Sequence, residues 1–139
     1  MGRKRLVTKR RLVAIVDDEK DITGLFTDAL KRIDGISIVA FNDPTIALEH
    51  FKTNFDAYAV VISDFRMPEI NGIELLKNVK DSNPLVRTIL VSAYSLEDPE
   101  LEECIKNEII NNFIQKPIRL AHLLEEVNNQ LHLYELNKK

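Results

Sequence analysis

The chain has 139 residues, of which 45% are hydrophobic and 29% are charged, and its net charge is −3. This length suits one domain whose core is large enough to fold without a disulfide or a structural metal. No apolar run reaches the roughly 20 residues of a membrane-spanning helix, and no signal peptide is recognisable. The single cysteine excludes an intrachain disulfide and suits a reducing compartment, so we expect a cytoplasmic protein without a membrane span.

Charge is distributed unevenly along the chain. Six of the 19 basic residues fall within residues 1–11, which contain no acidic residue, so the remainder is strongly acidic. An acidic body is a poor partner for nucleic acid. We interpret residues 1–10 as a flexible basic arm, with contact to nucleic acid or anionic lipid as the alternative. Residues 11–135 are the predicted domain, and residues 136–139 are a predicted polar tail.

Short apolar runs rich in β-branched residues alternate with amphipathic stretches from one end of the chain to the other. The runs predict buried strands, and apolar residues at helical spacing predict helices between them. We expect strands at residues 12–16, 36–41, 57–63, 88–91 and 113–115. We expect helices at residues 22–33 with Gly35 as the stop signal, and at 44–51, 72–79, 97–109 and 118–134.

This alternation predicts an α/β fold: a doubly wound, five-stranded parallel sheet with helices on both faces. In such a sheet the functional crevice lies at the carboxyl ends of the strands, near the point where the strand order reverses. The residues that follow each predicted strand are therefore the candidates for function.

Polar residues with complementary chemistry follow four of the five predicted strands. They are Asp17, Asp18 and Glu19 after the first strand, Asp64 after the third, Ser92 after the fourth and Lys116 after the fifth. The second strand contributes none by this interpretation. Carboxylates in one crevice repel each other, and a hard divalent cation relieves that repulsion. With an ammonium group and a hydroxyl beside them, they predict a phosphoryl-transfer site with an aspartate nucleophile.

Each of these residues alone has an ordinary structural explanation. Acidic residues after a strand are often solvated or cap a helix, a serine is often a cap, and Lys-Pro is often a turn. The prediction depends on their occurrence together at one edge of the sheet.

The chain resembles the receiver domains of two-component response regulators, the CheY-like family, from about residue 12 to residue 131. The matching motifs are Val16-Asp17-Asp18-Glu19, Asp64-Phe65-Arg66-Met67-Pro68 with Asn71-Gly72 behind it, Val91-Ser92-Ala93 and Lys116-Pro117. The resemblance implies a flavodoxin-like, CheY-like fold and a signalling role. It also implies that the chain is not an enzyme beyond its own phosphoryl transfer and autodephosphorylation.

The resemblance implies a role for each residue of the site. Asp64 would accept a phosphoryl group from a histidine kinase or a phosphotransfer protein. Asp17, Asp18, Asp64 and the backbone carbonyl of Arg66 would hold Mg²⁺ or Mn²⁺, with Asp17 assisting through metal-bound water. Lys116 would pair with the phosphate.

The resemblance also implies a conformational switch. Ser92 would move to sense the phosphate, and Phe113 would move inward with it. The surface of the fourth helix, fifth strand and fifth helix would then act on a downstream protein or on a second copy of the chain. We further hypothesise that Arg66 and Tyr94 shield the acyl phosphate from water and lengthen its life.

Two features near the fourth helix depart from the family or stay open. Residues 109–110 are isoleucines where many receivers have Gly-Ala, so we expect Asn111 or Asn112 to supply any left-handed residue of the turn. The acidic face of the helix at 97–108 is either simply solvated or an interface for a basic partner.

Other classes of protein fit less well. An aspartate-dependent phosphatase usually carries Asp-x-Asp after the first strand and needs a cap domain, and a nucleotide- or flavin-binding fold needs a glycine-rich loop, whereas the chain has four glycines. A degenerate receiver would lack the intact set of acids. No DNA-binding segment follows the last helix, and the short polar tail favours a stand-alone regulator over a fragment of a longer protein.

Overall fold

The computed structural model describes residues 11–93 and 98–138. Strands and helices alternate strictly along these residues, as predicted. The strands are β1 (Arg11–Val16), β2 (Ile36–Phe41), β3 (Tyr58–Asp64), β4 (Arg87–Ser92) and β5 (Asn112–Gln115). The helices are α1 (Lys20–Leu30), α2 (Pro44–Thr53), α3 (Gly72–Ser82), α4 (Pro99–Lys106) and α5 (Leu120–Lys138).

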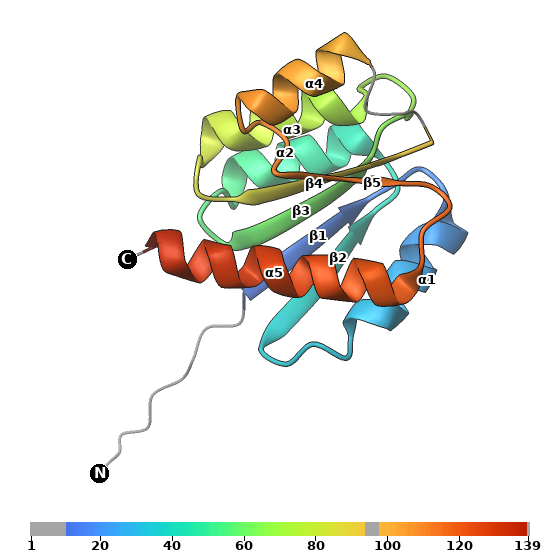
Figure 1. The fold of residues 1–139 in the computed structure, drawn as a ribbon, viewed down its shortest axis with the longest axis vertical. Coiled ribbons are helices and arrows are strands. Elements are labelled where there is room, and N and C mark those ends of the chain that lie inside the picture. The colour runs from blue at the N-terminus through green and yellow to red at the C-terminus, as the bar shows by residue number, and fades with distance from the viewer. Residues whose placement is uncertain (1–10, 94–97, 139) are drawn as a thin grey trace.

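The strands form one parallel sheet in the order β2-β1-β3-β4-β5. Helices α1 and α5 cover one face of this sheet, and α2, α3 and α4 cover the other (Figure 1). The predicted doubly wound sheet is therefore confirmed. The strand order reverses between β1 and β3, which places a crevice at the carboxyl ends of these two strands.

Two hydrophobic clusters, one on each face of the sheet, hold the layers together. Along β1, Val13 and Ile15 face the first cluster, and Ala14 and Val16 face the second. Every residue of β3 is buried, because this central strand has helices on both sides. Burial on both faces explains why the strands appear in the sequence as continuous apolar runs.

The ends of α1 and α4 differ from the prediction. Helix α1 stops at Leu30, before the predicted end at residue 33, and Gly35 with φ 81° lies in the following turn. Helix α4 spans Pro99–Lys106 and is shorter than the predicted 97–109, since Asp98 caps its start and Asn107 its end. The left-handed residue after α4 is Glu108, with φ 61°, so the expectation of an asparagine there was wrong.

Helix α5 is longer than predicted. It continues to Lys138, so the described residues of the expected polar tail, 136–138, are helical. Its buried apolar residues are Leu123, Val127, Leu131 and Tyr134, whereas Leu120 and Leu124 are only partly buried. An ion pair between Arg11 and Glu135 joins the start of β1 to the end of α5.

Residues 1–10, the predicted basic arm, lie outside the described residues. Within the described part of the chain, no helix combines the length and the apolar character needed to cross a membrane.

Candidate functional site

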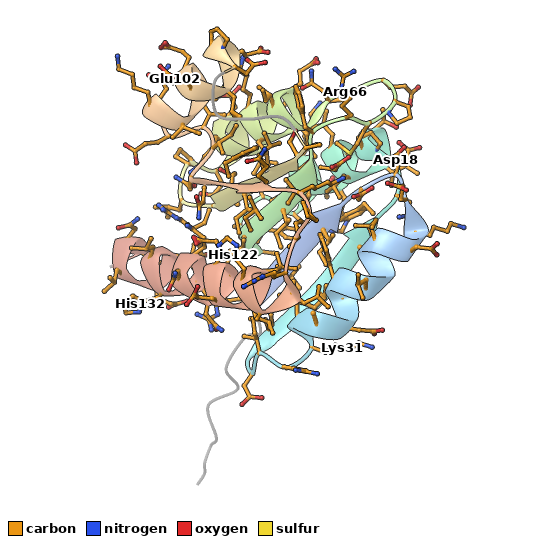
Figure 2. All side chains as sticks on the ribbon, turned by 45° about the vertical axis from the view of Figure 1, so that its right-hand side comes forward. Asp18, Lys31, Arg66, Glu102, His122 and His132 are labelled. Atoms are coloured by element: carbon orange, nitrogen blue, oxygen red, sulfur yellow. The ribbon has the colours of Figure 1, made fainter. Side chains whose placement is uncertain are left out.

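Three carboxylates converge at the carboxyl ends of β1 and β3. Asp17 and Asp18 directly follow β1, and Asp64 is the last residue of β3. The two strands are adjacent and in register up to the pair Val16 and Ser63, so the residues that follow lie side by side. One oxygen atom from each carboxylate lies within 4.8 Å of the others. Asp18 and the nearby Arg66 lie on loops at the same end of the molecule (Figure 2).

Asp17 is the most deeply buried of the three acids, with 2% of its surface exposed. Its burial raises the pKa of the carboxyl group to about 6, and the negative charge of Asp64 adds to this effect. A hydrogen bond of 2.9 Å from the backbone N–H of Glu19 to Asp17 Oδ1 opposes the shift. Burial and the neighbouring acid therefore disfavour the negatively charged form of Asp17.

Lys116 supplies the positive charge of the site. It follows β5, and its Nζ lies 2.9 Å from Asp64 Oδ1. Partial burial would lower the pKa of the Lys116 ammonium, but the hydrogen bond and charge of Asp64, with the charges of Asp17 and Glu19, raise it overall. The peptide bond between Lys116 and Pro117 is cis.

Ser92 ends β4, between the strands that carry Asp64 and Lys116. It is buried, and its backbone carbonyl accepts a hydrogen bond of 2.8 Å from the backbone N–H of Lys116. Val91 pairs with Asp64 across the sheet, which places Ser92 at the same edge. The ends of β1, β3, β4 and β5 therefore bring the predicted residues together at one edge of the sheet. These residues are Asp17, Asp18, Asp64, Ser92 and Lys116.

The loop behind Asp64 is packed too tightly for a side chain at Gly72. A Cβ atom there would overlap the backbone oxygen of Asp64 and lie 2.7 Å from a methyl group of Leu90. The backbone N–H of Gly72 donates to the carbonyl of Phe65 at 2.8 Å. Asn71 caps α3 by accepting from the backbone N–H of Glu74. The Asn-Gly pair thus fixes the chain that leaves Asp64.

The remaining predicted site residues lie around this edge or outside the described residues. Arg66 is exposed on the loop after β3 (Figure 2). Phe113 is half-buried on β5 and packs against the cluster beneath α2, α3 and α4. Tyr94 lies outside the described residues. The roles predicted for these three residues stay predictions.

Sequence reasoning missed Asn42, which directly follows β2. Its Nδ2 donates to the backbone oxygen of Asp17 at 2.9 Å and to Thr23 Oγ1 at 3.0 Å. The expectation that the second strand contributes nothing to this edge was therefore wrong. The signal is its position at a strand end, but Asn42 also directly precedes Asp43 and Pro44, which are typical of a helix start.

The donor set fits a divalent cation. Oxygen atoms of carboxylates are the ligands that hard cations prefer, and burial of Asp17 makes the uncompensated charge costly without one. Among the described residues, this is the one cluster of acidic, histidine or cysteine side chains arranged in this way.

A doubly wound sheet with three acids, a hydroxyl and a lysine at its carboxyl edge defines the class of CheY-like receiver domains. Comparison with known families agrees, because the family described as response regulator receiver domain matches residues 13–128. The chain belongs to this family. It is thus a receiver domain of the two-component response regulators, a signalling domain rather than a conventional enzyme.

Individual relatives are similar at moderate identity. The CAI-1 autoinducer sensor kinase/phosphatase CqsS of Vibrio cholerae is 29% identical over 119 residues, which cover 84% of this chain and 17% of CqsS. The response regulator protein TodT of Pseudomonas putida is 24% identical over 132 residues, which cover 95% of this chain and 56% of TodT. The chain therefore spans less than two thirds of either relative.

A solved structure matches nearly the whole fold. A response regulator receiver domain protein from Clostridium thermocellum is 25% identical, with a TM-score of 0.81 over 91% of this chain and 98% of that one. The flavodoxin-like, CheY-like fold class is thereby confirmed.

Proposed function

We propose that Asp64 is the phosphate acceptor of this receiver domain, and that its donor is the phosphohistidine of a histidine kinase or phosphotransfer protein. The observation that carries the proposal is the contact of Asp64 with Lys116 at 2.9 Å beside the carboxylates of Asp17 and Asp18. A carboxylate held between a fixed cation and a cation-binding acid pair is suited to receive a phosphoryl group.

In the proposed transfer, an oxygen of Asp64 attacks phosphorus as the phosphorus–nitrogen bond of the phosphohistidine breaks. The leaving imidazole nitrogen keeps the electron pair of that bond, and a new phosphorus–oxygen bond forms. Lys116 lies where it can offset negative charge on the transferring group. Beyond its own phosphorylation and dephosphorylation, the domain needs no enzymatic activity.

The metal site is assigned to Asp17, Asp18, Asp64 and the backbone carbonyl of Arg66, with Mg²⁺ or Mn²⁺ as the ion. When bound, such an ion offsets the charge that develops on the phosphoryl oxygens. Asp18 and Asp64 would bind directly, and Asp17 would act through water.

The phosphorylated form is proposed to act through α4, β5 and α5. A phosphoryl group adds about −1.5 to −2 charges to the crevice, and Ser92 and Lys116 would contact it only when it is present. Phe113 lies half-buried on β5, and we propose that its packing changes when the phosphate is present. The output partner would be a downstream protein or a second copy of the chain. We place these events in the cytoplasm, where a histidine kinase finds its substrate ATP.

Arg66 is proposed to lengthen the life of the acyl phosphate, together with Tyr94. Arg66 is exposed on the loop two residues after Asp64, and in this proposal its side chain covers the approach to the phosphoryl group. If this is its role, Arg66→Ala combined with Tyr94→Ala should speed dephosphorylation. An unchanged rate of phosphate loss would contradict the assignment.

Intact mass measurement after exposure to a small phosphodonor tests the proposed function. With Mg²⁺ the protein should gain one phosphate and lose it slowly, and without a divalent cation it should gain little. Continuous turnover of the phosphodonor with no phosphorylated protein at any time would indicate a phosphatase instead.

A further inference from the structure

We infer that Asn42, supported by Thr23, is a positioning residue that holds the Asp17–Asp18 segment ready for a divalent cation. The inference deepens the proposed function and rests on it. Asn42 touches neither the phosphoacceptor nor any carboxylate oxygen in the contacts described, so its effect would be exerted through the backbone of Asp17.

Asp17 is held on both sides of its Cα atom, by the last residue of β2 and by the residue that directly follows it. Its backbone N–H donates to the carbonyl of Phe41 at 3.0 Å, which is the last backbone hydrogen bond between β1 and β2 at this edge. Its backbone carbonyl accepts from Asn42 Nδ2 at 2.9 Å. The side chain of Asn42 thus adds one more hydrogen bond beyond the last residue pair of β1 and β2.

The held carbonyl belongs to the peptide bond that joins Asp17 to Asp18. Since a peptide unit is planar, fixing its oxygen fixes the plane between the two residues. One carboxylate then points into the crevice and is 2% exposed, and the other lies at the exposed rim. A fixed plane restricts ψ of Asp17 and φ of Asp18, and so restricts the direction in which the segment of the acids leaves β1.

Such an anchor is needed because the three acids repel one another before a cation binds. The segment after β1 is free to relieve that repulsion by turning outward, unless its backbone is held. Holding it in place moves the cost of ordering from the binding step to folding, which strengthens binding of the cation.

Thr23 gives the anchor a rigid base. It is 4% exposed on α1, its Oγ1 accepts from Asn42 Nδ2 at 3.0 Å, and the same hydroxyl donates to the backbone oxygen of Lys20 at 3.1 Å. Asn42 is not needed to cap α2, because Asp43 fills that role by accepting from the backbone N–H of Thr45. The side-chain amide of Asn42 is therefore free to bind the backbone of Asp17 instead of the start of α2.

Titration calorimetry with Mn²⁺ tests the inference. Asn42→Ala should weaken Mn²⁺ binding about tenfold, the lower end of the range for residues that orient metal ligands. Thr23→Val should weaken Mn²⁺ binding less than Asn42→Ala does. Thr23→Ser keeps the hydroxyl and should therefore bind Mn²⁺ with the wild-type affinity. The rate of phosphorylation by a small phosphodonor should fall at low Mg²⁺ and recover at saturating Mg²⁺.

Asn54→Ala is the matched control. Asn54 also donates its side-chain amide to a backbone carbonyl, that of His50 at 3.0 Å, but it lies at the far end of α2 from the acids. This variant should lose stability without losing affinity for Mn²⁺. Equal weakening in Asn54→Ala and Asn42→Ala would mean that general stability controls binding, and would overturn the inference.

Wild-type affinity in folded Asn42→Ala would also overturn it. If circular dichroism shows that Asn42→Ala is unfolded, Thr23→Val decides, and unchanged affinity there is equally contradictory. Failure of the wild-type protein itself to bind Mn²⁺ would instead contradict the proposed function, so the two failures can be told apart.

Discussion

Lys116 Nζ and Asp64 Oδ1 lie 2.9 Å apart although β4 separates the two strands that carry these residues. The contact crosses the carboxyl end of β4, where Ser92 is buried. A phosphoryl group on Asp64 would therefore be bordered by residues that end β3, β4 and β5. This relationship explains how phosphorylation of Asp64 could alter β4 and β5, which are followed by α4 and α5.

Replacing Lys116 should affect phosphorylation and metal binding in opposite directions. Lys116→Met removes the fixed cation, so the rate of phosphorylation at saturating Mg²⁺ should fall about tenfold or more. The same change removes a charge that repels Mn²⁺, so the affinity for Mn²⁺ measured by calorimetry should rise. Lys116→Arg, which keeps the charge, should leave the affinity near that of the wild type. A loss of affinity in Lys116→Met would be inconsistent with this arrangement.

Gly72→Ala should destabilise the protein, because the new methyl group would meet the backbone oxygen of Asp64. Overpacking of this kind costs about 1–3 kcal/mol in the free energy of unfolding, which urea denaturation can measure. Phosphorylation should slow as well, because the methyl group displaces the backbone of the phosphoacceptor.

Gly24→Ala is the control for that change. Gly24 lies on the exposed side of α1 with open space where a Cβ would stand, so alanine there should stabilise the protein by about 1 kcal/mol. Similar effects of the two substitutions would show that the close approach at Gly72 does not exist.

Lys80 on α3 should make stability depend on pH. Its burial, with the charge of Arg87, lowers the pKa of the ammonium from 10.5 to about 8 in the folded protein. The charged form is therefore disfavoured by folding below about pH 8, and this cost disappears as the pH rises from about 8 towards 10.5. Lys80→Met should be more stable than the wild type at pH 7, and the difference should shrink above pH 8.

Urea denaturation at several pH values measures this difference. Lys77→Met, at an exposed position of the same helix, is the control. Its free energy of unfolding should differ from that of the wild type by the same amount at every pH. A difference for Lys80→Met that stays constant from pH 7 to pH 10 would refute the assignment.

The fold and most of the site could be predicted from the sequence because both depend on short buried runs that end in polar residues. The run before Asp17 is apolar throughout, and the run before Asp64 is apolar except for Ser63, so the ends of both strands are clear in the sequence, and parallel strands bring such ends together. Asn42 was missed for the opposite reason. It stands beside Asp43 and Pro44, and three residues that all favour a helix start conceal which one faces the crevice.

Features that depend on tertiary contacts were not predictable in this way. The left-handed residue after α4 is Glu108 although asparagine is the better candidate locally. Asn111 is instead used to bind β4, since its Oδ1 accepts from the backbone N–H of Thr88 at 2.9 Å. The extension of α5 to Lys138 includes Leu136 and Asn137, which are exposed and so continue no buried stripe.

Localisation of the phosphoryl group by mass spectrometry tests the central claim most directly. After exposure to a small phosphodonor with Mg²⁺, the wild-type protein should carry one phosphate on the peptide that contains Asp64, and Asp64→Asn should carry none. Phosphate on a different residue of the wild type, or an equal gain by folded Asp64→Asn, would contradict the account.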